Sequence, residues 1–144
     1  MPEIDSELEL ALNYLDHNKD ESLKRLFDIL KIPSISTQEK YSKDCLNAAN
    51  WFVEQLKDIG FDASIRETTG HPMVVAHFEQ EGPHFLFYGH YDVQPIDPIE
   101  LWNHDPFKPK IEKSHNGEII KARGASDDKG QVMTFIEACR AHIK

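Results

Sequence analysis

Cysteine is scarce in this sequence, and basic residues are outnumbered. The 144 residues include two cysteines, Cys45 and Cys139, which lie far apart. Two isolated cysteines argue against a disulfide framework and against a zinc site built from thiolates. The 16 Lys and Arg residues face 25 Asp and Glu residues, which leaves a formal net charge of −9. This acidic balance argues against nucleic acid and anionic membranes as partners, because both require a basic surface.

Long apolar segments are lacking as well. No apolar run approaches the ~20 residues that cross a bilayer. The N-terminal MPEIDSELEL has neither the basic nor the apolar region of a secretory signal. We therefore expect a soluble, cytoplasmic protein with no membrane partner. A content of 40% hydrophobic and 28% charged residues is typical of a globular domain, and a chain of this length can build one core.

Apolar residues recur at helical spacing at both ends of the sequence. Leucines three and four positions apart predict helix over residues 6–31, interrupted near 16–20 and ended by Pro33. A helix is also predicted from about Gln38 to a Gly60 cap. Its predicted buried face consists of Cys45, Leu46, Ala49, Phe52, Val53, Leu56 and Ile59. A last helix, with Cys139 in the core, is predicted to begin within ASDDKGQV and to run to the chain end.

The middle of the sequence has the pattern of β-strands. Residues 61–67 alternate apolar and polar side chains, whereas 72–79 and 84–90 are richer in apolar residues and are predicted to be more buried strands. Short connections with glycine or proline predict hairpins or tight turns between them, and Asn116-Gly117 predicts a further hairpin within 110–124. The order of helices, strands and helix predicts an α/β fold, a layered α/β/α sheet with flanking helices.

The strand predicted over 84–90 ends in a histidine and an aspartate. In FLFYGHYDVQP, Asp92 follows His90 by two positions. Residues i and i+2 of a strand face the same side, so the carboxylate can reach the imidazole or whatever the imidazole binds. A metal-bound histidine commonly donates its other ring N–H to a carboxylate. A structural His–Asp pair in a half-buried strand is the alternative that this stretch alone leaves open.

A second acidic stretch, RGASDDKG, sets Asp127 beside Asp128 at the start of the last predicted helix. These acids could simply cap the helix and face its positive end. Carboxylates are also hard oxygen ligands for divalent metals, and a single carboxylate can bridge two ions. A histidine on one ion and an aspartate between two ions would begin a two-metal hydrolase site. The other histidines are expected at the surface or in packing: His17, His71, His77, His84, His104, His115 and His142.

Three motifs in this order resemble the N-terminal part of the catalytic domain of the M20 metallopeptidase family: GHYDVQP, the W and DPF of residues 102–107, and ARGASDDKG. The intact GHYDVQP and DDKG favour its dipeptidase and carnosinase branch. The resemblance implies that His90 and Asp127 are metal ligands, with Asp127 bridging two ions. It implies that Asp92 is the catalytic carboxylate that orients His90. It also implies a supporting Asp128 and a cis Asp127–Asp128 peptide.

The resemblance further implies an activity, the hydrolysis of dipeptides or short peptides by a water that two divalent ions activate. Zinc is expected, with manganese or cobalt as alternatives. An N-acyl amino acid deacylase and a non-catalytic module that retains the fold stay open as alternative functions. The family's Glu-Glu pair does not occur in the 144 residues, and its later ligands and lid or dimerisation domain are not recognised either. We therefore expect residues 1–144 to be the N-terminal part of a catalytic domain, inactive alone and homo-oligomeric.

Overall fold

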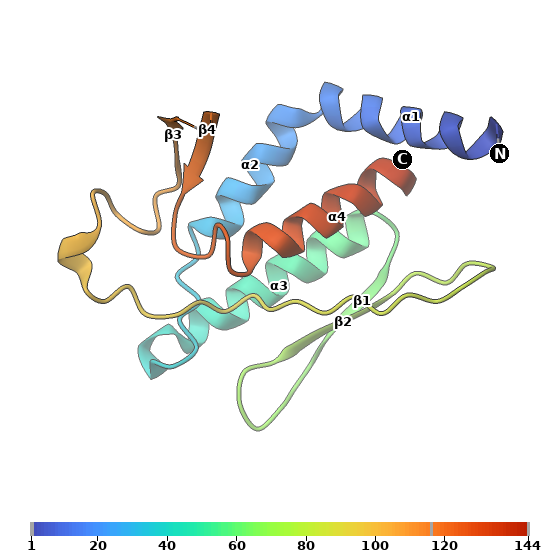
Figure 1. The fold of residues 1–144 in the computed structure, drawn as a ribbon. Helices are drawn as coiled ribbons and strands as arrows, with labels where there is room; N and C mark the ends of the chain where they lie inside the picture. Colours follow the sequence, from blue (N-terminus) through green and yellow to red (C-terminus); the bar gives the residue numbers. More distant parts are fainter. Residues whose placement is uncertain (1, 116, 144) are drawn as a thin grey trace.

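The computed structural model describes residues 2–115 and 117–143, with side chains from residue 6 onward. Two helices, α1 (Pro2–His17) and α2 (Lys19–Leu30), precede a 3-10 turn, η1 (Glu39–Tyr41), and the long helix α3 (Ser42–Asp58). The chain continues through β1 (Asp62–Arg66), β2 (Met73–His77), η2 (Ile99–Leu101), β3 (Lys110–Ser114), β4 (Gly117–Lys121) and α4 (Lys129–Ile143) (Figure 1). Within these described ranges, no helix combines the length and the apolar character that a membrane span requires.

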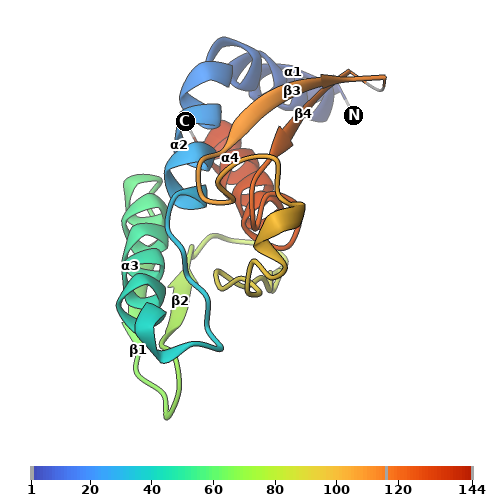
Figure 2. The same ribbon diagram turned by 90° about the vertical axis from the view of Figure 1, so that its left-hand side faces the viewer.

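The strands form two separate antiparallel hairpins, β1–β2 and β3–β4. The two hairpins lie on opposite sides of the helices in both views (Figures 1 and 2). The predicted α/β class is confirmed, although the described strands do not join into one sheet. The predicted second hairpin is confirmed by the pairing of Ser114 with Gly117. Asn116, which was predicted to form its turn, lies outside the described residues.

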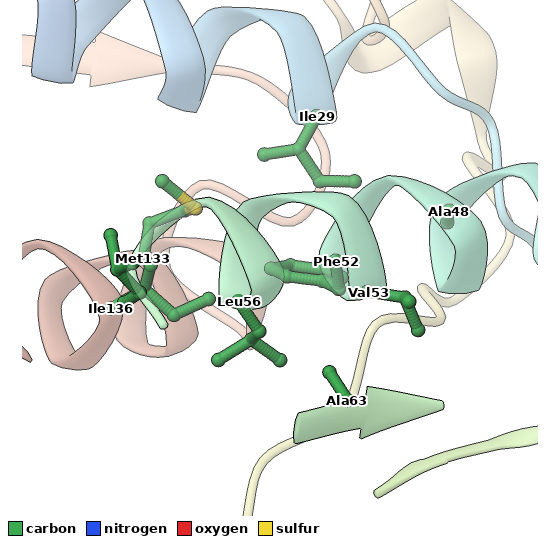
Figure 3. Close-up of a cluster of buried hydrophobic side chains, with 9 residues drawn as sticks. Ile29, Ala48, Phe52, Val53, Leu56, Ala63, Met133 and Ile136 are labelled. Atoms are coloured by element: carbon green, nitrogen blue, oxygen red, sulfur yellow. The ribbon is translucent and has the colours of Figure 1, made fainter. Parts of the chain in front are cut away.

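The core lies between α3 and its neighbours. Figure 3 shows side chains of α3 directed toward Ile29 of α2, Ala63 of β1 and the two α4 residues Met133 and Ile136. The α3 residues of this cluster are spaced three and four positions apart, as a buried helix face requires; they are Ala48, Phe52, Val53 and Leu56. Cys139 of α4 packs against the cluster and is partly buried.

The predicted helix boundaries agree with the structure at three points. The break between α1 and α2 falls at Asn18, inside the predicted interruption, and α2 ends before Pro33. Gly60 ends α3 with φ +98°, and the N–H of Phe61 donates to the carbonyl of Leu56 over 3.0 Å. A left-handed glycine with this back-bond is a common helix C-terminus.

Three burial predictions are wrong. Leu46 was placed on the buried face of α3, but it is 40% exposed because its position on the helix turns away from the core. The strand β2 is only half-buried, because one layer of helices covers it. Residues 84–90 form no strand at all in the described structure.

The segment 84–90 has the composition of a buried strand without its surroundings. Phe85, Leu86 and Tyr88 are 93%, 97% and 84% exposed. Phe87 stacks on Phe135 of α4, with the ring centroids 3.9 Å apart. Apolar runs of this kind become central strands when neighbouring strands pair with them and helices cover both faces. The residues that the structure describes supply no strand that pairs with this segment.

Candidate metal centre

The first of two segments that build the site is the His-x-Asp stretch, which is attached to the turn after α2. The N–H of Val93 donates to the carbonyl of Ser34 over 2.9 Å. Ile35 and Val93 form an isolated parallel bridge, and both side chains are buried. The sequence predicted that His90 and Asp92 lie at the end of a regular strand. In the structure this isolated bridge positions them instead.

The second segment is the loop before α4, which Lys129 fastens to the end of α2. The side chain of Lys129 is fully buried, and its ammonium donates to the carbonyls of Ile29 (3.1 Å) and Ile32 (2.6 Å). Burial lowers the pKa of Lys129 to about 7. Because the Nζ donors of Lys129 bind these carbonyls, the lysine anchors the loop and forms no ion pair with the two acids that precede it.

Two glycines permit close packing at the site: Gly130 inside the loop before α4, and Gly89 between the two segments. A Cβ on Gly130 would lie 1.9 Å from the carbonyl oxygen of Ala125, which no side chain can tolerate. A Cβ on Gly89 would lie 3.0 Å from Oδ2 of Asp128. With glycine there, the N–H of His90 donates to that same Oδ2 over 2.9 Å. The two segments are thus joined directly at the site.

The imidazole of His90 lies between two carboxylates. Its Nδ1 is 3.0 Å from Oδ1 of Asp92, and its Nε2 is 3.1 Å from Oδ1 of Asp127. A neutral imidazole has one N–H. If Nδ1–H donates to Asp92, the lone pair of Nε2 faces Asp127, and two acceptors this close need a proton or a cation between them. Burial lowers the pKa of His90, but Asp92, Asp127 and Asp128 outweigh this effect and raise the pKa above 6.5.

The ligand atoms of this cluster lie close enough together that small side-chain movements would let them hold one metal ion. His90, Asp127 and Asp128 each offer one atom, and these atoms lie within 4.8 Å of one another. Ligand atoms on one zinc ion, each at about 2.0–2.2 Å, are roughly 3–4 Å apart. Imidazole nitrogen with carboxylate oxygen suits zinc and also manganese. In the part of the chain that the structure describes, neither aspartate forms an ion pair with Lys or Arg.

The structure brings the predicted residues together. His90, Asp92 and Asp127 are linked by contacts of 3.0 and 3.1 Å, and the Asp127–Asp128 peptide is cis, as predicted. The assignment of metal ligands and of a catalytic carboxylate to these residues stays a prediction. The remaining histidines of the described chain do not belong to a group of three possible ligands.

Two contacts at the site were not foreseen. The hydroxyl of Ser36 donates a short hydrogen bond to Oδ2 of Asp92 across 56 residues of sequence. Asp128, predicted to have a supporting role, binds the backbone of His90 and is itself part of the ligand cluster. The PSIST stretch indicates a turn, but nothing in its composition indicates which carboxylate its serines reach.

A groove opens beside His90 and Asp92. Its volume is about 650 Å³, and its lining is mainly apolar: the exposed segment 85–88 forms one side, and Phe52, Leu56 and Phe135 belong to the helices opposite. Small-molecule sites are commonly concave, largely apolar and about 300–1,000 Å³ in volume. The candidate metal centre therefore lies at the edge of a space large enough for a small organic ligand.

Comparisons with known proteins identify the family. The model of peptidase family M20/M25/M40 matches residues 86–144, the part that contains all the candidate ligands. A Cys-Gly metallodipeptidase, DUG1 of Candida albicans, is 30% identical over 152 aligned residues, which cover 95% of this chain and 31% of that enzyme. The chain belongs to the M20 peptidase family. Another relative, the succinyl-diaminopimelate desuccinylase of Thioalkalivibrio sulfidiphilus, is 37% identical over 91 residues, 63% of this chain and 23% of the relative.

Solved structures of M20 dipeptidases have the same fold over nearly the whole chain. The dipeptidase Dug1p of Saccharomyces cerevisiae matches with a TM-score of 0.80 and 28% identity, covering 93% of this chain and 30% of that one. Human carnosine dipeptidase 1 matches with a TM-score of 0.78 and 25% identity, also covering 93% and 30%. This M20 chain therefore spans about 30% of the length of the dipeptidases that it matches.

Proposed function

We propose that this M20 chain contributes part of a two-metal centre to a dipeptidase. The observation that carries the proposal is the approach of His90 Nε2 to Asp127 Oδ1 over 3.1 Å, with Asp128 in the same cluster. Divalent ions, zinc or else manganese or cobalt, would polarise the scissile carbonyl and lower the pKa of a water molecule. The further ligands and the general base of such a centre would come from outside residues 1–144, the N-terminal part of the catalytic domain in this proposal.

Each side chain has a separate task in this proposal. His90 would bind one ion through Nε2, and Asp127, whose side chain is 81% exposed, would be shared between two ions. Asp92 would keep the proton on Nδ1, so that the lone pair of Nε2 would be available to a metal ion. Asp128 joins the loop to the backbone of His90 through Oδ2.

A dipeptide or short peptide is the substrate that we propose. Similarity to Cys-Gly dipeptidases over 95% of the chain supports it, and the groove beside the site has room for such a ligand. Deacylation of an N-acyl amino acid is the second candidate, favoured by the 37% identity with a desuccinylase. We also propose a cytoplasmic location, which the two unpaired cysteines support, since disulfides are rare there.

Hydrolysis assays separate the two reactions. The 144-residue chain and the complete natural protein that contains it are incubated with Cys-Gly, other dipeptides and N-acetyl amino acids, each with Zn²⁺, Mn²⁺ or Co²⁺. We expect the complete protein to release amino acids from dipeptides, and the 144-residue chain alone to give no turnover above the blank. The lack of a general base alone is worth about 10²–10⁴-fold in rate. His90→Ala in the complete protein should remove most of the dipeptidase activity.

Two outcomes contradict this proposal. Hydrolysis of N-acetyl amino acids but of no dipeptide would assign the deacylase reaction instead. Turnover by the 144-residue chain alone would show that its own residues complete the site.

Self-association into a homo-oligomer is also proposed, and the exposed side chains of Phe85, Leu86 and Tyr88 support it, since exposed apolar patches favour association. Light scattering of the purified chain tests it. A monomeric mass at every concentration would contradict the expected self-association.

A further inference from the structure

Ser36 lies outside the segments that contain the candidate metal ligands. It lies in the turn between α2 and η1, and its hydroxyl donates a short hydrogen bond to Oδ2 of Asp92. The other oxygen of the same carboxylate, Oδ1, is 3.0 Å from Nδ1 of His90. Each oxygen of Asp92 therefore has its own donor. A carboxylate held at both oxygens cannot rotate without breaking one of these bonds.

The backbone of Ser36 is itself fixed from two sides. Nε2 of His71 lies 2.8 Å from the carbonyl of Ser36, which ties the turn to the loop between β1 and β2. On the other side, the Ile35–Val93 bridge joins the turn to the segment that carries Asp92. The hydroxyl thus approaches Asp92 from a framework that three separate parts of the chain build.

We propose that Ser36 is a positioning residue of the metal centre. It holds the carboxylate of Asp92 in the orientation that accepts Nδ1–H of His90, and so directs Nε2 of His90 toward the metal. The inference rests on the proposed metal function of His90. The side chain of Asp92 is 36% exposed, so without the hydroxyl it can turn toward water. Nδ1 of His90 then keeps only the backbone carbonyl of Asp92, 3.1 Å away, as its acceptor. Outer-shell partners of metal ligands commonly affect metal affinity about 10–100-fold.

The chain contains a matched control for this bond. Ser22 also donates its hydroxyl to a partly buried carboxylate, Oε2 of Glu137 over 2.8 Å, but Glu137 is not part of the ligand cluster. Ser36→Ala and Ser22→Ala therefore remove the same kind of hydrogen bond from two places. Zinc affinity is measured by competition with a chelator, and thermal unfolding is followed in parallel.

We expect Ser36→Ala to weaken zinc binding about 10-fold, and Ser22→Ala to change it less than about twofold, although both variants lower the melting temperature. Ser36→Thr, which keeps the hydroxyl, should restore the affinity. Ser36→Cys, a weaker donor of similar size, replaces the alanine variant if that variant does not fold. Equal affinity losses in Ser36→Ala and Ser22→Ala would overturn the proposal, because they would show a general loss of stability.

A second readout needs no metal. In ¹⁵N-labelled protein, the Nδ1–H proton of His90 should be protected from exchange in the wild type and in Ser22→Ala, and broadened by exchange in Ser36→Ala. An unchanged Nδ1–H signal in Ser36→Ala overturns the role of Ser36, and so does a changed signal without a change in affinity. If neither the 144-residue chain nor the complete protein binds zinc, the proposed metal function fails, and the Nδ1–H comparison alone decides whether Ser36 positions His90.

Discussion

Two acidic sites of this molecule, Glu137 and the pair Asp127–Asp128, differ in the cations that face them. Glu137 of α4 is 8% exposed, and its carboxylate accepts hydrogen bonds from Nε and Nη2 of Arg25, both at 2.7 Å. Ser22 donates to it at 2.8 Å, and Arg140 lies 3.6 Å away. Asp127 and Asp128 are more exposed and face a histidine in place of an arginine.

This difference separates a structural acid from the two acids that we propose as metal ligands. A buried carboxylate is tolerated when paired charges and hydrogen bonds replace its water, and Glu137 has both. Two neighbouring acids without such a cation repel each other and raise the affinity of the site for a divalent ion. We therefore expect the role of each acid to depend on whether a cation compensates its charge, more than on the number of carboxylates. Each of the following variants tests this expectation.

The largest expected effect is on metal binding. The 144-residue chain should bind zinc weakly, with a Kd above about 1 μM, because zinc sites usually need three or four protein ligands. His90→Ala and Asp127→Asn should each weaken this binding at least about 100-fold, since each removes a proposed ligand and not only an outer-shell partner. Calorimetric zinc titration measures the affinity and the number of ions.

Glu137→Gln is the control for these titrations and should leave the zinc affinity unchanged. An equal loss in Glu137→Gln would mean that global stability governs binding. Sub-micromolar binding of two ions by the wild type would show that residues 1–144 contain ligands beyond His90, Asp127 and Asp128.

The stability of the metal-free protein should respond in the opposite order. Glu137→Gln leaves Arg25 without its buried partner, and we expect it to lower the free energy of unfolding by about 2–3 kcal/mol. Asp127→Asn removes an exposed, repelled charge and should change that free energy by less than about 0.5 kcal/mol. Urea denaturation at neutral pH with excess chelator measures both. A larger loss in Asp127→Asn would show that the aspartate is structural.

The same pair predicts a pH dependence. Burial raises the pKa of Glu137, but the hydrogen bonds and charges of Arg25, Ser22 and Arg140 outweigh it and lower the pKa below 4.5. A carboxyl whose pKa is lowered in the folded state stabilises the fold above its unfolded pKa, and this contribution is lost as pH falls through the folded pKa. The wild type should therefore lose its advantage over Glu137→Gln as pH falls below about 4.5. A constant difference down to pH 3 would contradict this assignment.

Local patterns were enough to predict much of the fold. The spacing of Phe52, Val53 and Leu56 places them on one face of any helix, and Gly60 marks its end whatever packs against it. The burial of residues 84–90 could not be predicted in this way, because it depends on neighbours elsewhere in the chain. Phe85 is apolar in the sequence but 93% exposed in the structure, and only tertiary contacts distinguish the two outcomes.

The candidate site shows the same limit. His90 and Asp92 are two positions apart, and Asp127 adjoins Asp128, so the short motifs contain them. The bond from Ser36 to Asp92 spans 56 residues and that from Arg25 to Glu137 spans 112. No periodicity in the sequence relates such distant positions. The sequence therefore indicated which acids are candidate ligands, but not which acids are compensated.

The smallest expected effect concerns a third acid that has cations but lies on the outer β3–β4 hairpin. Glu112 contacts Nζ of Lys110 and of Lys121, each at 2.5 Å. The hydrogen bonds from Lys110 and Lys121 lower the pKa of Glu112 to about 2.

Ion pairs between flexible side chains at the surface contribute little to stability, because water and salt screen them and ordering the lysines opposes them. Glu112→Gln should therefore change neither the melting temperature in physiological salt nor the zinc affinity. Thermal unfolding at low and at high salt measures the first. A loss as large as that of Glu137→Gln would mean that pairing alone stabilises a carboxylate, whereas we expect pairing and burial to be required together.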